Sequence, residues 1–169
     1  FLIALFIGLG VTALGAVCVQ GLLGGITVLY LLPTPVSTAH AGLAQIFFCL
    51  TIAIALFTSP RWTGPKYEPV DDRMLRLVAT TTTVFIYLQI VAGATMRHSD
   101  AGLAIPDFPL VFGGFIPPEW TPQIAVHFAH RVGAAVVTAA IVATVVHVCR
   151  RHWSNPLLKG PALLMVFLV

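Results

Sequence analysis

The sequence predicts an all-α polytopic membrane protein, and two observations lead to that prediction. Of its 169 residues, 58% are hydrophobic and only 9% are charged, whereas soluble domains carry about 25% charged residues. Four apolar runs are also long enough to cross a hydrocarbon core of ~30 Å, which takes about 20 helical residues. Nine Lys and Arg with six Asp and Glu cannot cover a water-facing surface, so a soluble enzyme is excluded.

The predicted transmembrane helices follow one another through the chain. They cover roughly residues 1–32, 39–58, 75–96 and 123–149, and a fifth starts near Pro161. The first run lacks the charged n-region and the cleavage site of a signal peptide and is too long for one. We therefore interpret it as a spanning helix. Because Phe1 and Val169 both lie inside apolar runs, we expect the chain to be a fragment of a longer protein.

Basic residues gather in two connections between the predicted helices. They are Arg61, Lys66, Arg73 and Arg76 in the connection 59–76, and Arg150, Arg151 and Lys159 in the connection 150–160. Cytoplasmic loops accumulate Lys and Arg, so both connections and the N-terminus of the chain are expected to be cytoplasmic. The link from Pro33 to Thr38 and residues 98–122, named here the outer segment, then face outward. Because the basic residues flank the helices, we expect no nucleic-acid partner.

The outer segment has a composition unlike that of a transmembrane helix. It contains five prolines, which prevent a long helix. Its aromatic residues, of a type enriched at membrane interfaces, are Phe108, Phe112, Phe115 and Trp120. Two interpretations stay open: a lid that lies on the outer surface, or a loop that only connects two helices.

Histidines concentrate on the predicted outer side. Four of the six lie near the outer ends of their helices: His40, His98, His127 and His130. An ionisable residue within a membrane helix is a functional hypothesis by default, although a hydrogen bond between helices is the alternative for any one of them. His147 and His152 lie near the basic inner connection, where we favour the hydrogen-bond interpretation.

Haem is the ligand that best suits the two intramembrane candidates. Haem iron takes axial histidine, and helix bundles build such sites between facing helices. Small residues follow both histidines: Gly42 and Ala44 after His40, Gly133 and Ala134 after His130. We expect these helix faces to leave room for a flat macrocycle, so His40 and His130 are the predicted haem ligands.

Two arginines lie on the outer side against the positive-inside trend. Arg97 and Arg131 each stand next to a histidine. Guanidinium groups bind carboxylates through two parallel hydrogen bonds, so haem propionates are their expected partners. The alternative is a structural pair of Arg131 with Asp100 or Asp107.

A short internal repeat indicates a duplicated architecture. Gln20 precedes Gly24 by four residues in the first predicted helix, and Gln89 precedes Gly93 by four in the third. We call these two pairs the glutamine–glycine repeat. By itself it is a weak signal, because close helix packing is the default explanation for membrane-helix glycines.

Three longer stretches resemble a known family. The runs VQGLLGGITVLYLLPTPVSTAH, LQIVAGATMRHSDAGLAIPDFPL and HFAHRVGA strongly resemble haem A synthase, a family of membrane enzymes that convert haem O to haem A for terminal oxidases. The similarity covers nearly all of the chain. The combination of AGLAxPDFPL with His-Arg on the next helix is quite specific, whereas either motif alone is weaker.

The resemblance implies an eight-helix bundle made of two similar four-helix halves. On that basis residues 1–58 end the N-terminal half, residues 59–76 form a cytoplasmic linker, and residues 77–169 begin the C-terminal half. His40 would then bind the iron of the substrate haem, and His130 would bind the iron of a haem b cofactor. The second histidine of each site is expected on a helix outside this chain.

Two departures from the family pattern limit what carries over. Ile105 and Val111 stand where many relatives have cysteines, so no thiol relay can be assigned to the outer segment. The family's catalytic glutamate belongs to the His-Arg motif of the other half, and His127 occupies the equivalent position here. The catalytic residue is therefore unknown in this chain and expected outside it, and the chain alone should be inactive.

The expected function is haem A synthase: oxidation of a haem O methyl group to a formyl group, with haem b as cofactor supplying the redox chemistry that side chains lack. Expected partners are the lipid bilayer and a haem O synthase as supplier; the electron acceptor is not assigned. The expected location is the bacterial plasma membrane or the mitochondrial inner membrane. The alternatives are a di-haem cytochrome that only passes electrons, and a transporter or purely structural bundle.

The positions of the basic residues generate a topology prediction. A thiol reagent that cannot cross membranes should not label Lys66→Cys in intact cells but should label it after lysis, whereas a cysteine in the outer segment should react in intact cells. The native cysteines Cys18, Cys49 and Cys149 would first be replaced by serine. Labelling of position 66 from outside intact cells would contradict the orientation.

Overall fold

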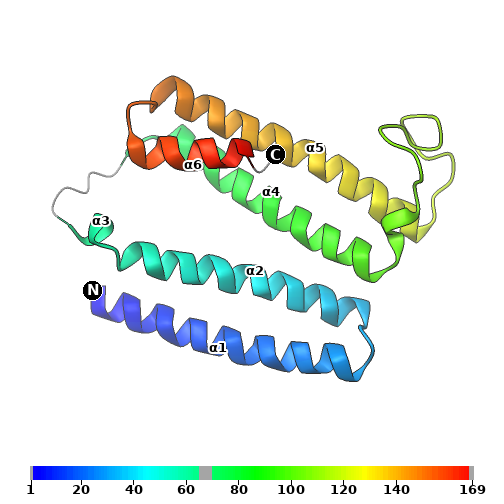
Figure 1. Ribbon diagram of the computed structural model, residues 1–169, viewed down its shortest axis with the longest axis horizontal. Helices are drawn as coiled ribbons and strands as arrows, with labels where there is room; N and C mark the ends of the chain where they lie inside the picture. The colour runs from blue at the N-terminus through cyan, green and yellow to red at the C-terminus, as the bar shows by residue number, and fades with distance from the viewer. Residues whose placement is uncertain (1, 65–69, 168–169) are drawn as a thin grey trace. The chain divides into compact units, whose positions relative to one another are not determined.

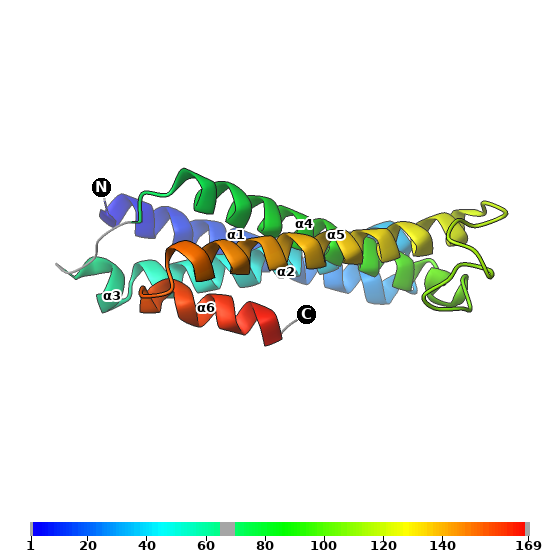
Figure 2. The ribbon, with the colours of Figure 1, turned by 90° about the horizontal axis from the view of Figure 1, so that it is seen from above.

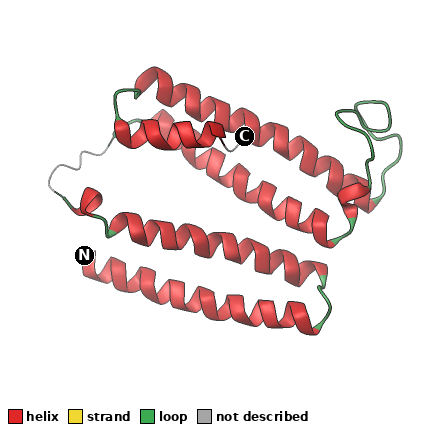
Figure 3. Ribbon diagram, in the orientation of Figure 1, coloured by secondary structure: helices red, strands yellow, loops and turns green. Residues whose placement is uncertain are grey.

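A computed structural model describes residues 2–64 and 70–167 of the chain, and all of its regular elements in these ranges are helices (Figure 3). The chain divides into two compact units, Phe1–Val70 and Asp71–Val169, which are described separately. Residues 65–69 of the predicted cytoplasmic linker, Lys66 among them, lie outside the described residues.

The first unit is an antiparallel helix pair. Helices α1 (Leu2–Leu29) and α2 (Thr34–Phe57) lie side by side, and the single-turn helix α3 (Pro60–Thr63) follows (Figure 1). The predicted start of α2 at residue 39 was too late. Pro35 lies in the first turn of this helix, where a missing N–H costs nothing because those donors have no partner within the helix.

The second unit is also built on an antiparallel pair. Helices α4 (Arg73–His98) and α5 (Pro122–Arg151) lie side by side in both views (Figures 1 and 2), and between them runs the outer segment with the short 3₁₀ helix η1 (Ala101–Leu103). Helix α6 (Pro156–Phe167) packs back against α5.

Helix α6 begins five residues before the predicted start, and Pro161 lies inside it. The signal is Asn155, whose side-chain oxygen accepts a hydrogen bond of 3.0 Å from the Leu157 N–H while its carbonyl accepts from Leu158 and Lys159. An asparagine that pairs the free N–H groups of a first turn is a strong helix start. The predicted start at Pro161 was therefore wrong.

The four long helices match the predicted membrane spans in number and order. Within the described residues, four helices are long and apolar enough to cross a membrane: Ala4–Leu29, Thr34–Phe57, Arg73–His98 and Pro122–Arg151. Large apolar side chains are exposed along them, for example Val28 at 75% and Leu22 at 68%. Such surfaces are stable against lipid, which confirms a multi-pass all-α membrane protein.

Threonines join the first half of α4 to the second half of α5. Thr82 is only 2% exposed, and its hydroxyl donates to the Ala140 carbonyl at 3.1 Å and lies 2.8 Å from the Thr144 hydroxyl. Interhelical hydrogen bonds of this kind contribute about 0.6 kcal/mol on average in membranes. Their main consequence here is a fixed register between the two helices.

Candidate functional site

His40 is held by a glutamine of the neighbouring helix. Gln20 on α1 donates its side-chain N–H to the His40 carbonyl oxygen at 3.0 Å, and the same nitrogen lies 3.5 Å from His40 Nε2. Gly24, one turn further along α1, faces the imidazole: a Cβ at that position would lie 3.2 Å from His40 Cε1. The ring therefore packs directly against the α1 backbone.

The second unit repeats this contact with different residues. Gln89 on α4 donates to the His130 carbonyl at 2.8 Å, and its amide nitrogen lies 3.1 Å from His130 Nδ1. A Cβ at Gly93 would lie 3.0 Å from His130 Cε1. The glutamine–glycine repeat thus marks the same histidine contact in both helix pairs, which is more than close helix packing alone.

Glycine suits the position beside each ring, because a Cβ there would require the imidazole to move by a few tenths of an ångström. Gly133 has a related role on α5, since a Cβ at this position would overlap with Gln89 Oε1. The Gln89 amide thus lies directly against the α5 backbone at Gly133.

The polar atoms around His40 are incompletely paired. Among the described residues, four buried side-chain atoms have no hydrogen-bond partner: Gln20 Oε1, Ser37 Oγ, Thr38 Oγ1 and His40 Nδ1. All four belong to the Gln20–His40 contact or to the turn of α2 just before His40. An unpaired buried polar group costs about 1–3 kcal/mol, so the hydrogen bonding around His40 is less complete than that around His130.

Arg131 ties the outer segment to α5. Its guanidinium donates to the carbonyls of Leu110 at 3.0 Å and Ile105 at 3.1 Å, and its Nε donates to His127 Nε2 at 3.1 Å. The Phe108 ring lies 5.7 Å from the guanidinium carbon. The alternative of a structural pair with an aspartate is not seen: within the described residues no salt bridge joins Arg131 to Asp100 or Asp107.

Asp107 instead folds the outer segment onto itself. Its two carboxylate oxygens accept hydrogen bonds of 2.8 Å from the backbone N–H groups of Phe112 and Gly113. These two bonds, that of Gly113 first, hold the pKa of Asp107 below its ordinary value, with a smaller contribution from the charge of Arg131. Phe112 and Gly113 both have positive φ, at 53° and 79°, so the carboxylate stabilises a tight turn.

The other predicted residues of the outer side are His127, His98 and Arg97, and each has different neighbours. His127 is buried, and its Nδ1 lies 3.3 Å from the Ile105 N–H while its Nε2 meets Arg131. Because a neutral imidazole accepts through one nitrogen only, the shorter contact with Arg131 is the better hydrogen bond. His98 is the last residue of α4, and Arg97 beside it is exposed.

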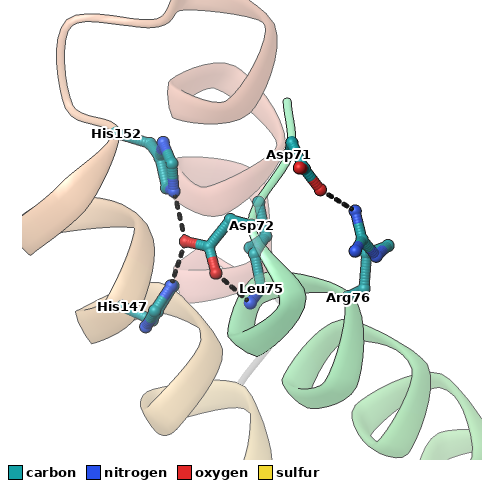
Figure 4. A network of polar contacts seen from close by, with 6 residues as sticks. All are labelled: Asp71, Asp72, Leu75, Arg76, His147 and His152. Carbon is teal, nitrogen blue, oxygen red and sulfur yellow. Dashed lines mark hydrogen bonds and ion pairs between the residues drawn. The ribbon is translucent and has the colours of Figure 1, made fainter. Parts of the chain in front are cut away.

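His147 and His152 both contact Asp72, a residue for which no role was predicted. Both Nε2 atoms contact Asp72 Oδ2, at 2.8 Å and 2.7 Å, while Asp72 Oδ1 accepts from the Leu75 N–H and caps α4 (Figure 4). We name these three residues the inner cluster. Hydrogen bonds from His152, Leu75 and His147 hold the pKa of Asp72 well below its usual range. The interhelical hydrogen bonds expected for both histidines are thereby confirmed.

Comparison with known proteins supports a family assignment. Residues 6–169 match the family COX15-CtaA, described as cytochrome oxidase assembly protein. Proteins named heme A synthase from Staphylococcus aureus strains RF122 / ET3-1, JH9 and Newman are each 28% identical over 150 residues, which is 87% of this chain and 48% of theirs. The chain thus spans about half the length of these curated relatives.

The Asp107 turn generates a pH prediction. A carboxylate with a lowered pKa stabilises the folded turn fully above its ordinary pKa, and this stabilisation is lost as the pH falls through the lowered value. Amide hydrogen exchange of residues 105–118, corrected for its intrinsic pH dependence, should therefore accelerate only at pH values below the ordinary carboxyl range.

Asp107→Ala should show the same fast exchange already at neutral pH. Asp100→Asn is the matched control, because Asp100 is exposed and its side chain caps nothing. Equal protection in Asp107→Ala and the parent protein would contradict the assignment.

Proposed function

The chain belongs to the COX15-CtaA family of cytochrome oxidase assembly proteins, and from this premise we propose that the whole protein is a haem A synthase. It would oxidise a methyl group of haem O to a formyl group, giving haem A for terminal oxidases. The observation that supports this most directly is the repeated contact in which a glutamine of one helix holds a histidine of the next, Gln20 with His40 and Gln89 with His130.

We propose that His130 is a ligand of the haem b iron and that His40 is a ligand of the substrate haem iron. The residues fit this role. Gln89 contacts His130 Nδ1, which leaves Nε2 without a hydrogen bond in the described chain, and His40 Nδ1 is buried and unpaired. A bound haem b would supply the redox chemistry that side chains lack.

Gln89 would set the orientation and the tautomer of His130. Ligation through Nε2 needs the proton on Nδ1, and that N–H needs an acceptor. A side-chain amide has both a donor and an acceptor, so a rotation of the Gln89 amide presents Oε1 to Nδ1–H. Gln20 lies beside the other nitrogen of its histidine, 3.5 Å from His40 Nε2, so Nδ1 is the His40 nitrogen left for a ligand; Gln20 Oε1 is also unpaired and buried.

Arg97 and Arg131 are proposed to bind haem propionates. Arg131 uses three of its five N–H groups on Ile105, Leu110 and His127, which leaves two for an anionic ligand. Arg97 is exposed in the last turn of α4. The carbonyl bonds would fix the Arg131 guanidinium in place before a ligand arrives.

The proposed setting is the bacterial plasma membrane or the mitochondrial inner membrane, with the N-terminus of this chain in the cytoplasm or its equivalent compartment. A haem O synthase is the proposed supplier of substrate. No residue of this chain points to the electron acceptor. Because the second axial histidines and the catalytic glutamate are expected outside this chain, the activity belongs to the whole protein.

The haem assignments are tested in the full-length protein. His130→Ala should lower the content of tightly bound haem b, because it removes an axial ligand, whereas His40→Ala should retain haem b and lose conversion of added haem O. Haem content follows from the pyridine haemochrome spectrum, and product from chromatography of extracted haems. Full haem b content together with full conversion in both variants would refute the assignment.

The same experiment separates the proposal from its main alternative. A di-haem cytochrome that only passes electrons would bind haem through both histidines, yet it would convert no haem O under any condition. A transporter or structural bundle would show no Soret band in the purified full-length protein.

Arg131 has its own test. Arg131→Gln should lower haem occupancy markedly, because the propionate loses a charged partner, and Arg131→Lys should recover only part of it, because lysine lacks the planar fork. Loss of occupancy should exceed that in Asp107→Ala, which loosens the outer segment but keeps the guanidinium. If Arg131→Gln and Asp107→Ala reduce haem content equally, Arg131 only anchors the segment and the propionate role is wrong.

A further inference from the structure

We propose that the inner cluster, Asp72 with His147 and His152, is a binding site for one divalent transition-metal ion of the Zn²⁺ type. The site joins the N-cap residue of α4 to the last turn and the C-cap residue of α5. It is independent of the proposed haem chemistry, because His147 lies 17 residues beyond His130 on the same helix, or roughly 25 Å along its axis.

The geometry brings three ligand atoms to one point. His147 Nε2 and His152 Nε2 lie 2.8 Å and 2.7 Å from the same oxygen, Asp72 Oδ2. Each of the three residues offers one ligand atom, and these atoms all lie within 4.8 Å of one another. As Figure 4 shows, both imidazoles approach the carboxylate from the α5 side. Small rotations of the two rings would place a cation between the three atoms.

The ligand set is typical of zinc. Imidazole nitrogen and carboxylate oxygen bind Zn²⁺ at about 2.0–2.2 Å, and sites with three protein ligands complete their coordination with water. The side chains of His147 and His152 are each 18% exposed and that of Asp72 is 20% exposed. Water therefore reaches the cluster, both to provide a fourth ligand and to allow the ion to enter.

Hydrogen bonds with backbone groups of Leu75 and Val148, which are not part of the cluster, hold Asp72 and His152 in position. Asp72 Oδ1 accepts the Leu75 N–H at 2.9 Å, so the carboxylate is oriented by a partner that a metal would not displace. The His152 N–H bonds to the Val148 carbonyl at 2.8 Å, which fixes this residue against the end of α5. Hydrogen bonds that orient ligands in this way typically raise metal affinity 10–100-fold.

Nearby positive charge acts against a cation but does not exclude one. Arg73, Arg150 and Arg151 line the same groove. All three are exposed, so water and salt screen their charges. A fourth arginine, Arg76, is paired with Asp71 at 2.9 Å, so its charge is offset by that carboxylate.

The competing interpretation is that the cluster is only a hydrogen-bonded helix cap. The test uses the full-length protein in detergent, stripped with chelator, dialysed against Zn²⁺ and washed, with bound zinc measured by mass spectrometry of the metal. We expect one more zinc per chain in the parent protein than in His147→Gln or His152→Gln, and an affinity for Zn²⁺ at least roughly 100-fold weaker in each variant.

Two further variants control for folding and charge. Asp72→Asn keeps a side-chain acceptor for the α4 cap but removes the anionic ligand, and it should also lose the zinc. Asp71→Asn removes the same charge from the neighbouring residue, which is exposed and outside the cluster, and it should bind zinc like the parent protein. Equal zinc content in all of these proteins would overturn the proposal.

X-ray absorption at the zinc edge tests the parent protein without any substitution. The expected spectrum has nitrogen or oxygen neighbours at about 2.0–2.2 Å with the outer-shell signature of two imidazoles. A spectrum with sulfur neighbours, or with no imidazole signature, would assign the bound zinc to another part of the protein and overturn the proposed site.

Discussion

Polar groups that lie within hydrocarbon must find partners inside the protein, and this requirement governs how the helices of both units meet. Gln20 and Gln89 meet it in the same way, by donating to the backbone carbonyl of a histidine on the next helix. That carbonyl already accepts the helical hydrogen bond, and the glutamine uses its second lone pair. Such a bond contributes only about 0.6–1.7 kcal/mol in a membrane, so its larger consequence is the fixed position of the histidine.

The two units use this shared contact to different extents. Around His130, the Gln89 amide reaches both the carbonyl and Nδ1. Around His40, the glutamine amide reaches Nε2 only at 3.5 Å, and Nδ1 and the glutamine oxygen are unpaired. A ligand group that is already held in position binds more tightly, because less freedom is lost on binding. The difference between the units therefore supports the proposed division between a cofactor site and a substrate site.

Fold class could be predicted from composition and run length alone, because a hydrocarbon core of known thickness sets the length of every span. The ends of the helices could not be predicted in this way, since they depend on single side chains. With Pro35 in its first turn, α2 begins before the predicted residue, and with Asn155 just before it, so does α6. The glutamine–glycine repeat was visible in the sequence, but its partner residues depend on how two helices pair. The inner cluster could not be predicted for the same reason, because Asp72 contacts two histidines that lie 75 and 80 residues after it in the chain.

Arg131 shows why hydrogen bonding and charge must be counted separately. Its bonds to Ile105, Leu110 and His127 satisfy N–H groups. None of these three acceptors carries a negative charge, so the bonds do not neutralise the guanidinium. Asp107 offsets this charge only weakly, because its oxygens accept hydrogen bonds from Phe112 and Gly113 and the charge of Arg131 is the smallest of the influences on its pKa. A guanidinium held in place by neutral acceptors favours an anionic ligand at its remaining N–H groups. The structural anchoring of the outer segment and the proposed propionate contact are therefore compatible uses of one side chain.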